Sequence, residues 1–332
     1  MDRERVLQYS LYSTMNKMSR IRFIICMSVA VIMTATACSY NAADAQSHEC
    51  CSFKRDRIER GMNHYLFEGF DDISGAQQTV NVLKVDLDSR KFKVVFNYGS
   101  DSTSSVAARR GAVAAINATY EPDATYIRVD GKNHHEVSIP SDHLRFWKHN
   151  GAITCDTEGQ VRIINGAPGQ ENTREGWIKA QELYKSLPDA NLFSGAPMLI
   201  DDYDPVGTRF VPDSLIGSDF KGIKYEDYRR HQGIRHPRTA VALTAENEFL
   251  MIVADGRNEK AAGMTARELT LFLAKHFNPR WALNLDGGGS ATMVIKGLGA
   301  PETNVVNHPH DNHKFDHYGQ RRICTHILVM KN

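Results

Sequence analysis

A short stretch near the C-terminus combines a carboxylate, three glycines and a hydroxyl at a spacing that suits the binding of a polar ligand. Residues 281–285 form an apolar run that predicts a buried strand, and Asp286 follows this run directly. Gly287–Gly289 let the backbone turn sharply or approach a ligand closely, and residues 290–295 predict a returning strand. The alternative is a tight turn without a ligand, but the three consecutive glycines favour a functional loop.

A second apolar run also ends in a carboxylate. Residues 238–244 and 248–254 predict two strands joined by a short turn, and Asp255 follows the second strand. The segment that begins at Thr265 predicts a helix, because Thr265 and Glu268 fit a capping box and apolar residues recur at helical spacing after them. The capping box explains Glu268 without a role in chemistry.

These elements make one strand-helix-strand unit over residues 248–296, the only convincing unit of its kind in the sequence. Residues 79–87 and 92–96 predict a hairpin, and no repeat or change of composition divides residues 52–332. The sequence therefore predicts an α+β fold, a mixed strand-rich single domain rather than a doubly wound sheet. Residues 201–235 are charged and irregular, which predicts a surface insertion that could also contact substrate.

The N-terminus has the pattern of an export signal. Within residues 1–37, a basic region precedes a short apolar run and a small-residue exit, which together predict a secretory signal. Small residues directly before Cys38 resemble a bacterial lipoprotein processing site, so Cys38 is the expected lipid anchor and residues 38–51 the tether. The alternative is ordinary cleavage nearby, for instance after Ala43 or Ala45. We expect an exported protein, periplasmic or an outer-membrane lipoprotein of a bacterium, with membrane contact only through the anchor.

The composition is that of an ordinary globular protein and argues against a nucleic-acid partner. The 332 residues are 42% hydrophobic and 24% charged, with a net charge of +1 and no long basic run. Cys155 and Cys324 lie next to strand-like segments and are predicted to form a disulfide. The histidines between His308 and His317 indicate an exposed loop. No cofactor is predicted, although Ca²⁺ or another divalent metal is left open because such sites need leave no sequence signature.

Four motifs occur in an order that resembles the phosphodiester glycosidase family. They are His236-Pro237-Arg238-Thr239-Ala240, Asp255-Gly256-Arg257, Gly263-Met264-Thr265 with Glu268-Leu269, and Asn284-Leu285-Asp286-Gly287-Gly288-Gly289-Ser290. The resemblance also takes in residues 116–120 and 194–199 and Arg321, so it spans roughly residues 79–330. One departure is Ala118-Thr119-Tyr120, where the family more often has Gly and Phe.

This resemblance implies hydrolysis of a sugar-1-phosphodiester at its anomeric carbon, with release of a free, GlcNAc-like sugar and a phosphomonoester. The reaction needs a carboxylate at the oxocarbenium-like centre, and arginines or backbone N–H groups for the diester anion. Asp286 and then Asp255 are the expected catalytic carboxylates. Their separation decides which of them attacks and whether configuration is retained, and the sequence leaves both questions open. The residues expected to bind substrate are Arg238, Thr239, Asn117, Asn284, Gly287, Gly288, Gly289, Ser290, Arg257 and Arg321.

Two other functions fit the same sequence. One is a hydrolase of ordinary glycosides or of a surface polysaccharide, and the other is a non-catalytic glycan-binding lipoprotein. Basic side chains that converge on Asp286 would favour the phosphodiester substrate. A long open cleft with aromatic side chains such as Trp147 and Trp177 would favour a polymer. In every case the expected ligand is a small carbohydrate, a sugar phosphate or a glycan.

Overall fold

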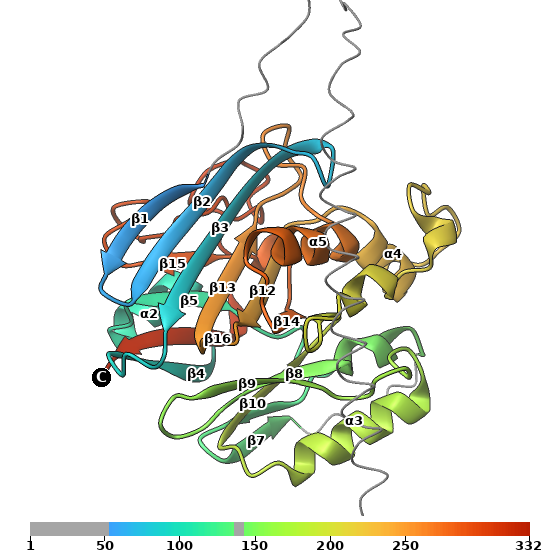
Figure 1. Cartoon of the computed structure of the whole chain (residues 1–332), viewed down its shortest axis with the longest axis horizontal. Coiled ribbons are helices and arrows are strands. Elements are labelled where there is room, and N and C mark those ends of the chain that lie inside the picture. The colour runs from blue at the N-terminus through green and yellow to red at the C-terminus, as the bar shows by residue number, and fades with distance from the viewer. Residues whose placement is uncertain (1–52, 136–142) are drawn as a thin grey trace, which may run out of the picture. The chain divides into compact units, whose positions relative to one another are not determined.

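The computed structural model describes residues 53–135 and 143–332. The predicted signal (residues 1–37), the anchor Cys38 and the tether (residues 38–51) lie outside the described residues. Within the described part of the chain, the named strands form three sheets in which every neighbouring pair is antiparallel (Figure 1).

The order of the strands across each sheet differs from their order along the chain. The seven-stranded sheet consists, from one edge to the other, of β1 (Lys54–Glu59), β2 (Met62–Asp71), β3 (Ala76–Asp86), β13 (Glu248–Ala254), β12 (Arg238–Leu243), β14 (Trp281–Asn284) and β11 (Met198–Ile200). The five-stranded sheet consists of β7 (Lys132–His135), β6 (Ile127–Val129), β10 (Asn191–Gly195), β8 (Gly151–Cys155) and β9 (Val161–Asn165). The four-stranded sheet consists of β15 (Met293–Ile295), β5 (Ala114–Asn117), β16 (Ile323–Lys331) and β4 (Phe92–Asp101).

The helices are few, and most of them pack against the sheets. The α-helices are α2 (Thr103–Arg110), α3 (Arg174–Ser186), α4 (Tyr228–Gly233) and α5 (Ala266–His276), and the 3₁₀ turns are η1 (His143–His149), η2 (Val206–Arg209), η3 (Asp213–Leu215) and η4 (Gly288–Ser290). Figure 1 shows α5 across the seven-stranded sheet and α3 against the five-stranded sheet. Among the described residues, no helix is both long and apolar enough to cross a bilayer.

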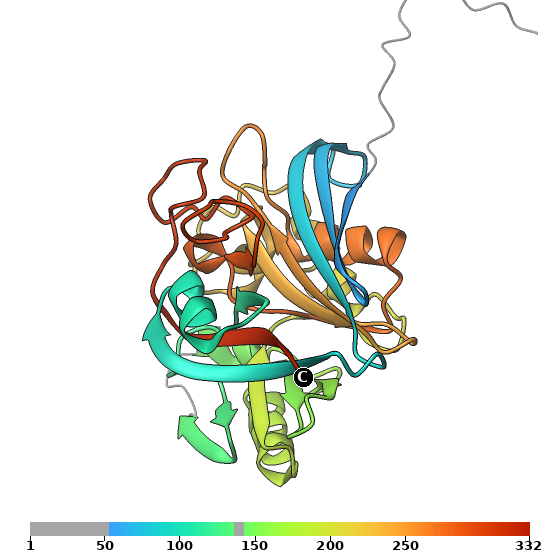
Figure 2. The same ribbon diagram turned by 90° about the vertical axis from the view of Figure 1, so that its left-hand side faces the viewer.

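The position of β13 at the centre of the seven-stranded sheet explains why its sequence is an unbroken apolar run. Phe249, Met251 and Val253 point into the main core, which the three sheets share. The alternate residues, such as Leu250 and Ile252, pack against α5 on the opposite face. Because both faces of the strand are buried, no polar alternation appears in the sequence. In Figure 2 the teal β4 and the red β16 run beneath the blue-to-orange strands of the seven-stranded sheet.

The predicted fold class is confirmed, since this is a strand-rich α+β domain with few helices. The strand-helix-strand unit over residues 248–296 is present as β13, α5, β14 and β15. The capping box at Thr265 is also present, because the Thr265 side chain accepts from the Glu268 N–H and the Glu268 carboxylate accepts from the Thr265 N–H. Glu268 therefore has the structural role that its position predicted, and it also pairs with Arg235.

Two predictions about pairing were wrong. Residues 79–87 and 92–96 do not form a hairpin, because β3 pairs with β2 and β13 whereas β4 pairs with β16 in another sheet. Cys155 and Cys324 are both free thiols. Cys155 is buried on β8, and its Sγ–H donates to the carbonyl of Val94 over 3.1 Å, so its polar hydrogen is already paired without a disulfide.

Candidate active site

Antiparallel pairing brings the polar ends of three strands together. β12 lies between β13 and β14 and runs against both, so the start of β12 is beside the ends of its two neighbours. Arg238, the first residue of β12, pairs with the last residue of β13. Asp255 and Asp286, which follow β13 and β14, consequently reach the same end of the sheet as Arg238.

The side-chain amide of Asn117 fixes the backbone at Asp286. Asn117 is the last residue of β5 and is fully buried. Its Nδ2 donates to the carbonyl oxygen of Asp286 over 2.6 Å, and its Oδ1 accepts from Thr239 Oγ1 at 2.7 Å and from the Thr292 N–H at 3.1 Å. The side-chain polar atoms of Asn117 and Thr239 are engaged in this internal network. The two residues therefore position the loop and are not available to a ligand.

Asn284 has a similar internal role on the other side of the loop. It is fully buried, and its Nδ2 donates to Tyr120 Oη at 2.9 Å and to the carbonyls of Ala196 at 2.7 Å and Leu285 at 2.8 Å. Ser290 is also buried and hydrogen-bonds the Asp286 carboxylate. These two predicted binding residues therefore hold the strand end and its carboxylate.

The glycine run is required by close approach of the backbone. A Cβ at Gly287 would collide with the carbonyl oxygen of Pro237, and a Cβ at Gly289 would lie 2.5 Å from Nη2 of Arg321. Gly288 has φ of +59°, where a side chain would be strained. The Gly288 N–H donates to Pro237 O at 2.8 Å, so the loop does not direct all three glycine N–H groups at a ligand.

A cavity of about 290 Å³ opens at this end of the sheet. It is lined by Tyr120, Glu121, Tyr225, Glu226, His231, His236, Arg238, Arg257, Asp286, Gly287, Gly288, Gly289 and Arg321. The volume is at the small end of the roughly 300–1,000 Å³ range of ligand pockets. The lining is rich in charges of both signs, which suits a small polar ligand.

Asp286 is the sequence-predicted carboxylate that lines this cavity. Burial raises its pKa to about 6, and the negative charge of Glu121 contributes in the same direction. The hydrogen bond from Ser290 and the positive charges of Lys148 and Arg321 oppose this rise. Asp286 therefore changes protonation state near neutral pH, where an ordinary aspartate is fully ionised.

Three arginines line the cavity, and two of them have no carboxylate partner among the described residues. Arg238 is 1% exposed, and its guanidinium donates to Gln232 Oε1 and to backbone carbonyls such as Met264 O at 2.8 Å. Arg257 is exposed and lies against His236, with 3.3 Å between Nη2 and Nδ1. The described residues thus give these two cations only neutral hydrogen-bond partners. An anionic ligand would balance the charge of the buried Arg238 and would replace water at the exposed Arg257.

Arg321 and two histidines also line the cavity. Arg321 lines the cavity while its Nε donates to Asp311 Oδ1 over 2.9 Å. Burial, followed by the charges of Arg238 and Arg257, lowers the pKa of His236 to about 3. Burial and neighbouring charges also hold the pKa of His231 well below its usual value. Both imidazoles are neutral in the physiological range, so the arginines supply the positive charge.

Asp255 is brought to this end of the sheet but does not line the cavity. Its carboxylate is 1% exposed and accepts from Asn307 Nδ2 at 3.0 Å and from the His308 N–H at 2.9 Å, with His308 Nδ1 at 2.8 Å. These bonds anchor the C-terminal loop that leads to Arg321. The catalytic role of Asp255 stays a prediction. Within the described residues, no group of three or more His, Cys, Asp or Glu is arranged to hold a metal ion.

Sequence reasoning missed several cavity residues. Glu121 lies four residues beyond the end of β5, and Asp286 lies two residues beyond the end of β14, so a search for carboxylates after apolar strands could have identified Glu121 as well. Tyr225 and Glu226 belong to the charged segment 201–235, for which substrate contact was the alternative to a plain surface insertion, but no local pattern distinguishes them there. Trp147 and Trp177, whose presence along a cleft would have favoured a polymer substrate, are 1% and 3% exposed and do not line the cavity.

Comparison with known proteins gives a consistent picture. The family model described as phosphodiester glycosidase matches residues 105–330. N-acetylglucosamine-1-phosphodiester alpha-N-acetylglucosaminidase from Bos taurus is 26% identical over 181 residues, which are 51% of this chain and 32% of that protein. The Mus musculus enzyme of the same name is 24% identical over 163 residues, 46% of this chain and 30% of its own length. The chain therefore spans about a third of the curated relatives it matches.

Solved structures show the same fold. The catalytic domain of the zebrafish N-acetylglucosamine-1-phosphodiester alpha-N-acetylglucosaminidase, auto-inhibited by its pro-peptide, has a TM-score of 0.54 at 20% identity and covers 82% of this chain and 83% of that one. A putative exported protein from Burkholderia pseudomallei has a TM-score of 0.51 at 15% identity, covering 77% and 74%. At these identities the likeness concerns the fold alone.

Substitution of Asn117 by Ala should destabilise the fold. It leaves the Thr292 N–H, the Thr239 hydroxyl and the Asp286 carbonyl without their partner, at roughly 1–3 kcal/mol for each buried group left unpaired. We expect the free energy of unfolding in urea to fall by at least about 2 kcal/mol. Asn63→Ala, at the opposite, peripheral part of the sheet, is the control and should change it by less than about 1 kcal/mol. Equal effects of the two variants would contradict the positioning role.

Proposed function

Because the chain belongs to the phosphodiester glycosidase family, we propose that it is an exo-acting hydrolase that cleaves a sugar-1-phosphodiester at the anomeric carbon. The products are a free, GlcNAc-like sugar and a phosphomonoester. One observation carries the choice of substrate, namely two cavity arginines, Arg238 and Arg257, that have no carboxylate partner in the described structure and share their cavity with Asp286. A phosphodiester anion matches the arginines, and the anomeric carbon matches the carboxylate.

Cleavage of the bond to phosphate makes different demands on the carboxylate and on the arginines of the cavity. When the bond between the anomeric carbon and the phosphate oxygen breaks, the electron pair stays on the phosphate, which is already a stabilised anion. Protonation of the leaving group therefore matters less than in ordinary glycoside cleavage. Asp286, in its ionised form, attacks the anomeric carbon or takes the proton of the attacking water. The arginines hold the phosphate in place and stabilise its growing charge.

The cavity favours a small terminal substrate over a long polymer. Its volume is about 290 Å³, and the two tryptophans that could have lined a polysaccharide cleft, Trp147 and Trp177, are buried and do not line it. Hydrolysis of ordinary glycosides is the second candidate function, and a non-catalytic glycan-binding protein is the third. Neither of them accounts for the two arginines without carboxylate partners as directly as a phosphodiester does.

The cellular location is a further part of the proposal. The signal-like pattern of residues 1–37 and the small residues before Cys38 support export of the chain and its attachment by a lipid at Cys38. Residues 38–51 then form a polar tether that holds the catalytic domain near the membrane surface. The substrate would be a carbohydrate phosphodiester outside the cytoplasm.

The first prediction concerns turnover of UDP-GlcNAc, a sugar nucleotide that serves as a stable analogue of a sugar-1-phosphodiester. The purified protein should release free GlcNAc, and Asp286→Asn should lower kcat by a factor of roughly 100 to 10,000 while substrate binding is kept. Asp213→Asn, an exposed aspartate whose side chain is 83% exposed, is the matched control and should keep full activity. Failure to release sugar from a panel of sugar-1-phosphodiesters would contradict the proposed function.

The second prediction concerns pH. Since Asp286 has a pKa of about 6 and acts as the ionised carboxylate, kcat/KM should rise about tenfold per pH unit below pH 6 and level off above it. The acid limb of the profile with UDP-GlcNAc measures this value directly. A rate that falls as the pH rises through 6 would show that protonated Asp286 is the active form.

The third prediction concerns the lipid anchor. In a bacterial host fed labelled palmitate, the wild-type protein should carry the label and sediment with membranes. Cys38→Ala should remove the label and shift the protein to the soluble fraction, because the anchoring thiol is lost. Cys155→Ala is the control, since Cys155 is buried and should not affect labelling. Label that persists in Cys38→Ala would contradict the anchor assignment.

A further inference from the structure

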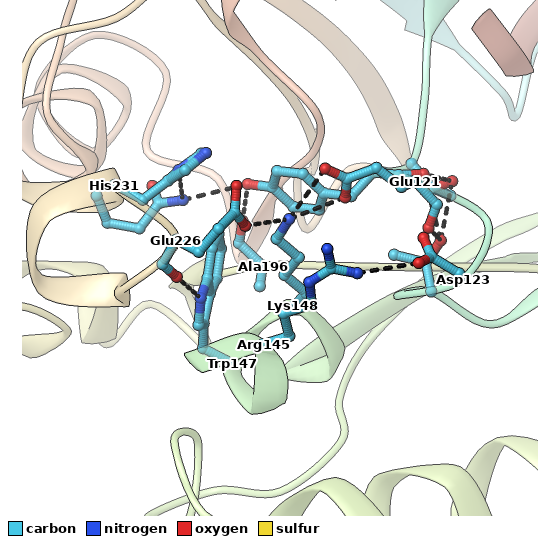
Figure 3. A network of polar contacts seen from close by, with 12 residues as sticks. Glu121, Asp123, Arg145, Trp147, Lys148, Ala196, Glu226 and His231 are labelled. Atoms are coloured by element: carbon cyan, nitrogen blue, oxygen red, sulfur yellow. Dashed lines mark hydrogen bonds and ion pairs between the residues drawn. The ribbon is translucent and has the colours of Figure 1, made fainter. Parts of the chain in front are cut away.

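A buried lysine lies beside the cavity and pairs with two of its carboxylates. Lys148 is on η1 and 1% exposed, and its Nζ lies 2.8 Å from Oε2 of Glu121 and 2.8 Å from Oε2 of Glu226 (Figure 3). Glu121 and Glu226 both line the cavity, with side chains 52% and 34% exposed. The cluster carries one positive and two negative charges, so one net negative charge remains on the cavity side.

The cluster joins three segments of the chain that are far apart in sequence. Glu121 follows β5, Lys148 lies in η1, and Glu226 directly precedes the N-cap of α4. The indole Nε1 of Trp147 donates to the carbonyl of Glu226 over 2.9 Å, and Lys148 Nζ lies 5.3 Å from the ring centroid of Tyr120. These contacts hold the ammonium in place, and cation–π attraction adds to them.

The lysine also fixes the orientation of the Glu121 carboxylate. Nζ of Lys148 donates to Oε1 of Glu121 at 3.1 Å and to Oε2 at 2.8 Å, so both oxygens are engaged from one side. The remaining lone pairs stay available because the side chain is half exposed at the cavity. The flexible Glu121 side chain is thereby held in one orientation in which its carboxylate can bind a ligand. The buried Lys148 ammonium depends on both of its carboxylate partners to compensate its charge.

We propose that Glu121 is the second carboxylate of the active site and that Lys148 is the residue that positions it. This proposal rests on the proposed function. As the carbon–oxygen bond to phosphate breaks, positive charge develops on the anomeric carbon and the sugar ring. Asp286, or the water that it deprotonates, forms the new bond to this carbon. Glu121 faces the same centre as a fixed negative charge and stabilises it in the transition state.

The electrostatics of Asp286 give this proposal a second line of support. Glu121 raises the pKa of Asp286, whereas Lys148 and Arg321 lower it. Two other cations, Arg238 and Arg257, line further parts of the cavity and are unchanged in the variants described below.

Two histidines and one tyrosine that line the cavity keep their protonation states near neutral pH. The imidazoles of His231 and His236 are neutral because their pKa values are strongly lowered. Burial raises the pKa of Tyr120 far above neutral pH, so its phenol stays protonated. Tyr225 lines the cavity from the insertion, and Glu226 remains the other partner of Lys148. Removal of the charge of Glu121 should therefore lower the pKa of Asp286, and removal of the charge of Lys148 should raise it.

The decisive variant is Glu121→Gln in the full chain, with UDP-GlcNAc as substrate. We expect kcat to fall about 100-fold or more, and the acid limb of kcat/KM to move to lower pH because the negative charge beside Asp286 is gone. Asp123→Asn is the matched control. It lies two residues away, pairs with Arg145 at 2.9 Å and is 71% exposed, and it does not line the cavity. Its kcat and acid limb should match those of the wild type.

The positioning role of Lys148 is tested with Lys148→Met. This variant should lower kcat and move the acid limb to higher pH, opposite to Glu121→Gln. In the Glu121→Gln background, Lys148→Met should cost at most about twofold more in kcat, because its effect passes through Glu121. Additive losses would overturn the positioning role. If Lys148→Met does not fold, Lys148→Arg replaces it, since the cation is kept while the geometry of its contact with Glu121 changes.

The outcomes separate this proposal from the proposed function. Sugar release by the wild type with full activity in Glu121→Gln overturns the assignment of Glu121 and leaves the function standing. Loss of activity in Glu121→Gln without a shift of the acid limb makes the residue merely structural and also overturns the assignment. An inactive wild type overturns the function and this assignment together.

Discussion

The amide of Asn117 is the contact on which the geometry of the site depends. It extends from β5 in the four-stranded sheet and binds the carbonyl of Asp286 at the end of β14 in the seven-stranded sheet. The same amide also binds Thr239 and Thr292, so one buried side chain ties together the loop, the neighbouring strand and the segment that leaves the loop. A buried amide with satisfied donors and acceptors is rigid, because breaking any bond leaves an unpaired polar group.

The protein places charges of both signs in and beside one cavity near this amide. Arg238 is buried against neutral carbonyls and amide oxygen, which satisfy its hydrogen bonds without cancelling its charge. Lys148 is buried against two glutamates that line the cavity, which leaves a net negative charge on this cluster. Burial of ions is costly unless partners compensate it, so such an arrangement is expected where a ligand supplies part of the compensation. A substrate with an anionic phosphate beside a carbon that becomes positive fits this distribution.

The sequence was a good guide to which segments are strands and a poor guide to their partners. The apolar run of residues 248–254 is a strand because burial on both faces demands it, and the capping box at Thr265 begins a helix through bonds within four residues. Pairing is different. Residues 79–87 and 92–96 looked like a hairpin, yet the chain passes from one sheet to another between them. Alternation of side chains records which face is buried, but it contains no information about which strand lies alongside.

At the functional site, too, the local sequence determined some features and the tertiary structure decided others. The local sequence determined that Asp286 stands at a strand end beside a loop that only glycine can form, because both features follow from burial and backbone sterics over a few residues. Only the tertiary structure decided that Glu121 and Glu226 share the cavity with Asp286, that Asp255 turns away from it, and that Arg238 meets neutral groups rather than a carboxylate among the described residues. These outcomes depend on contacts between residues that are far apart along the chain. Desolvation and Coulomb interactions act through space, so they become defined only when the fold has placed the charges together.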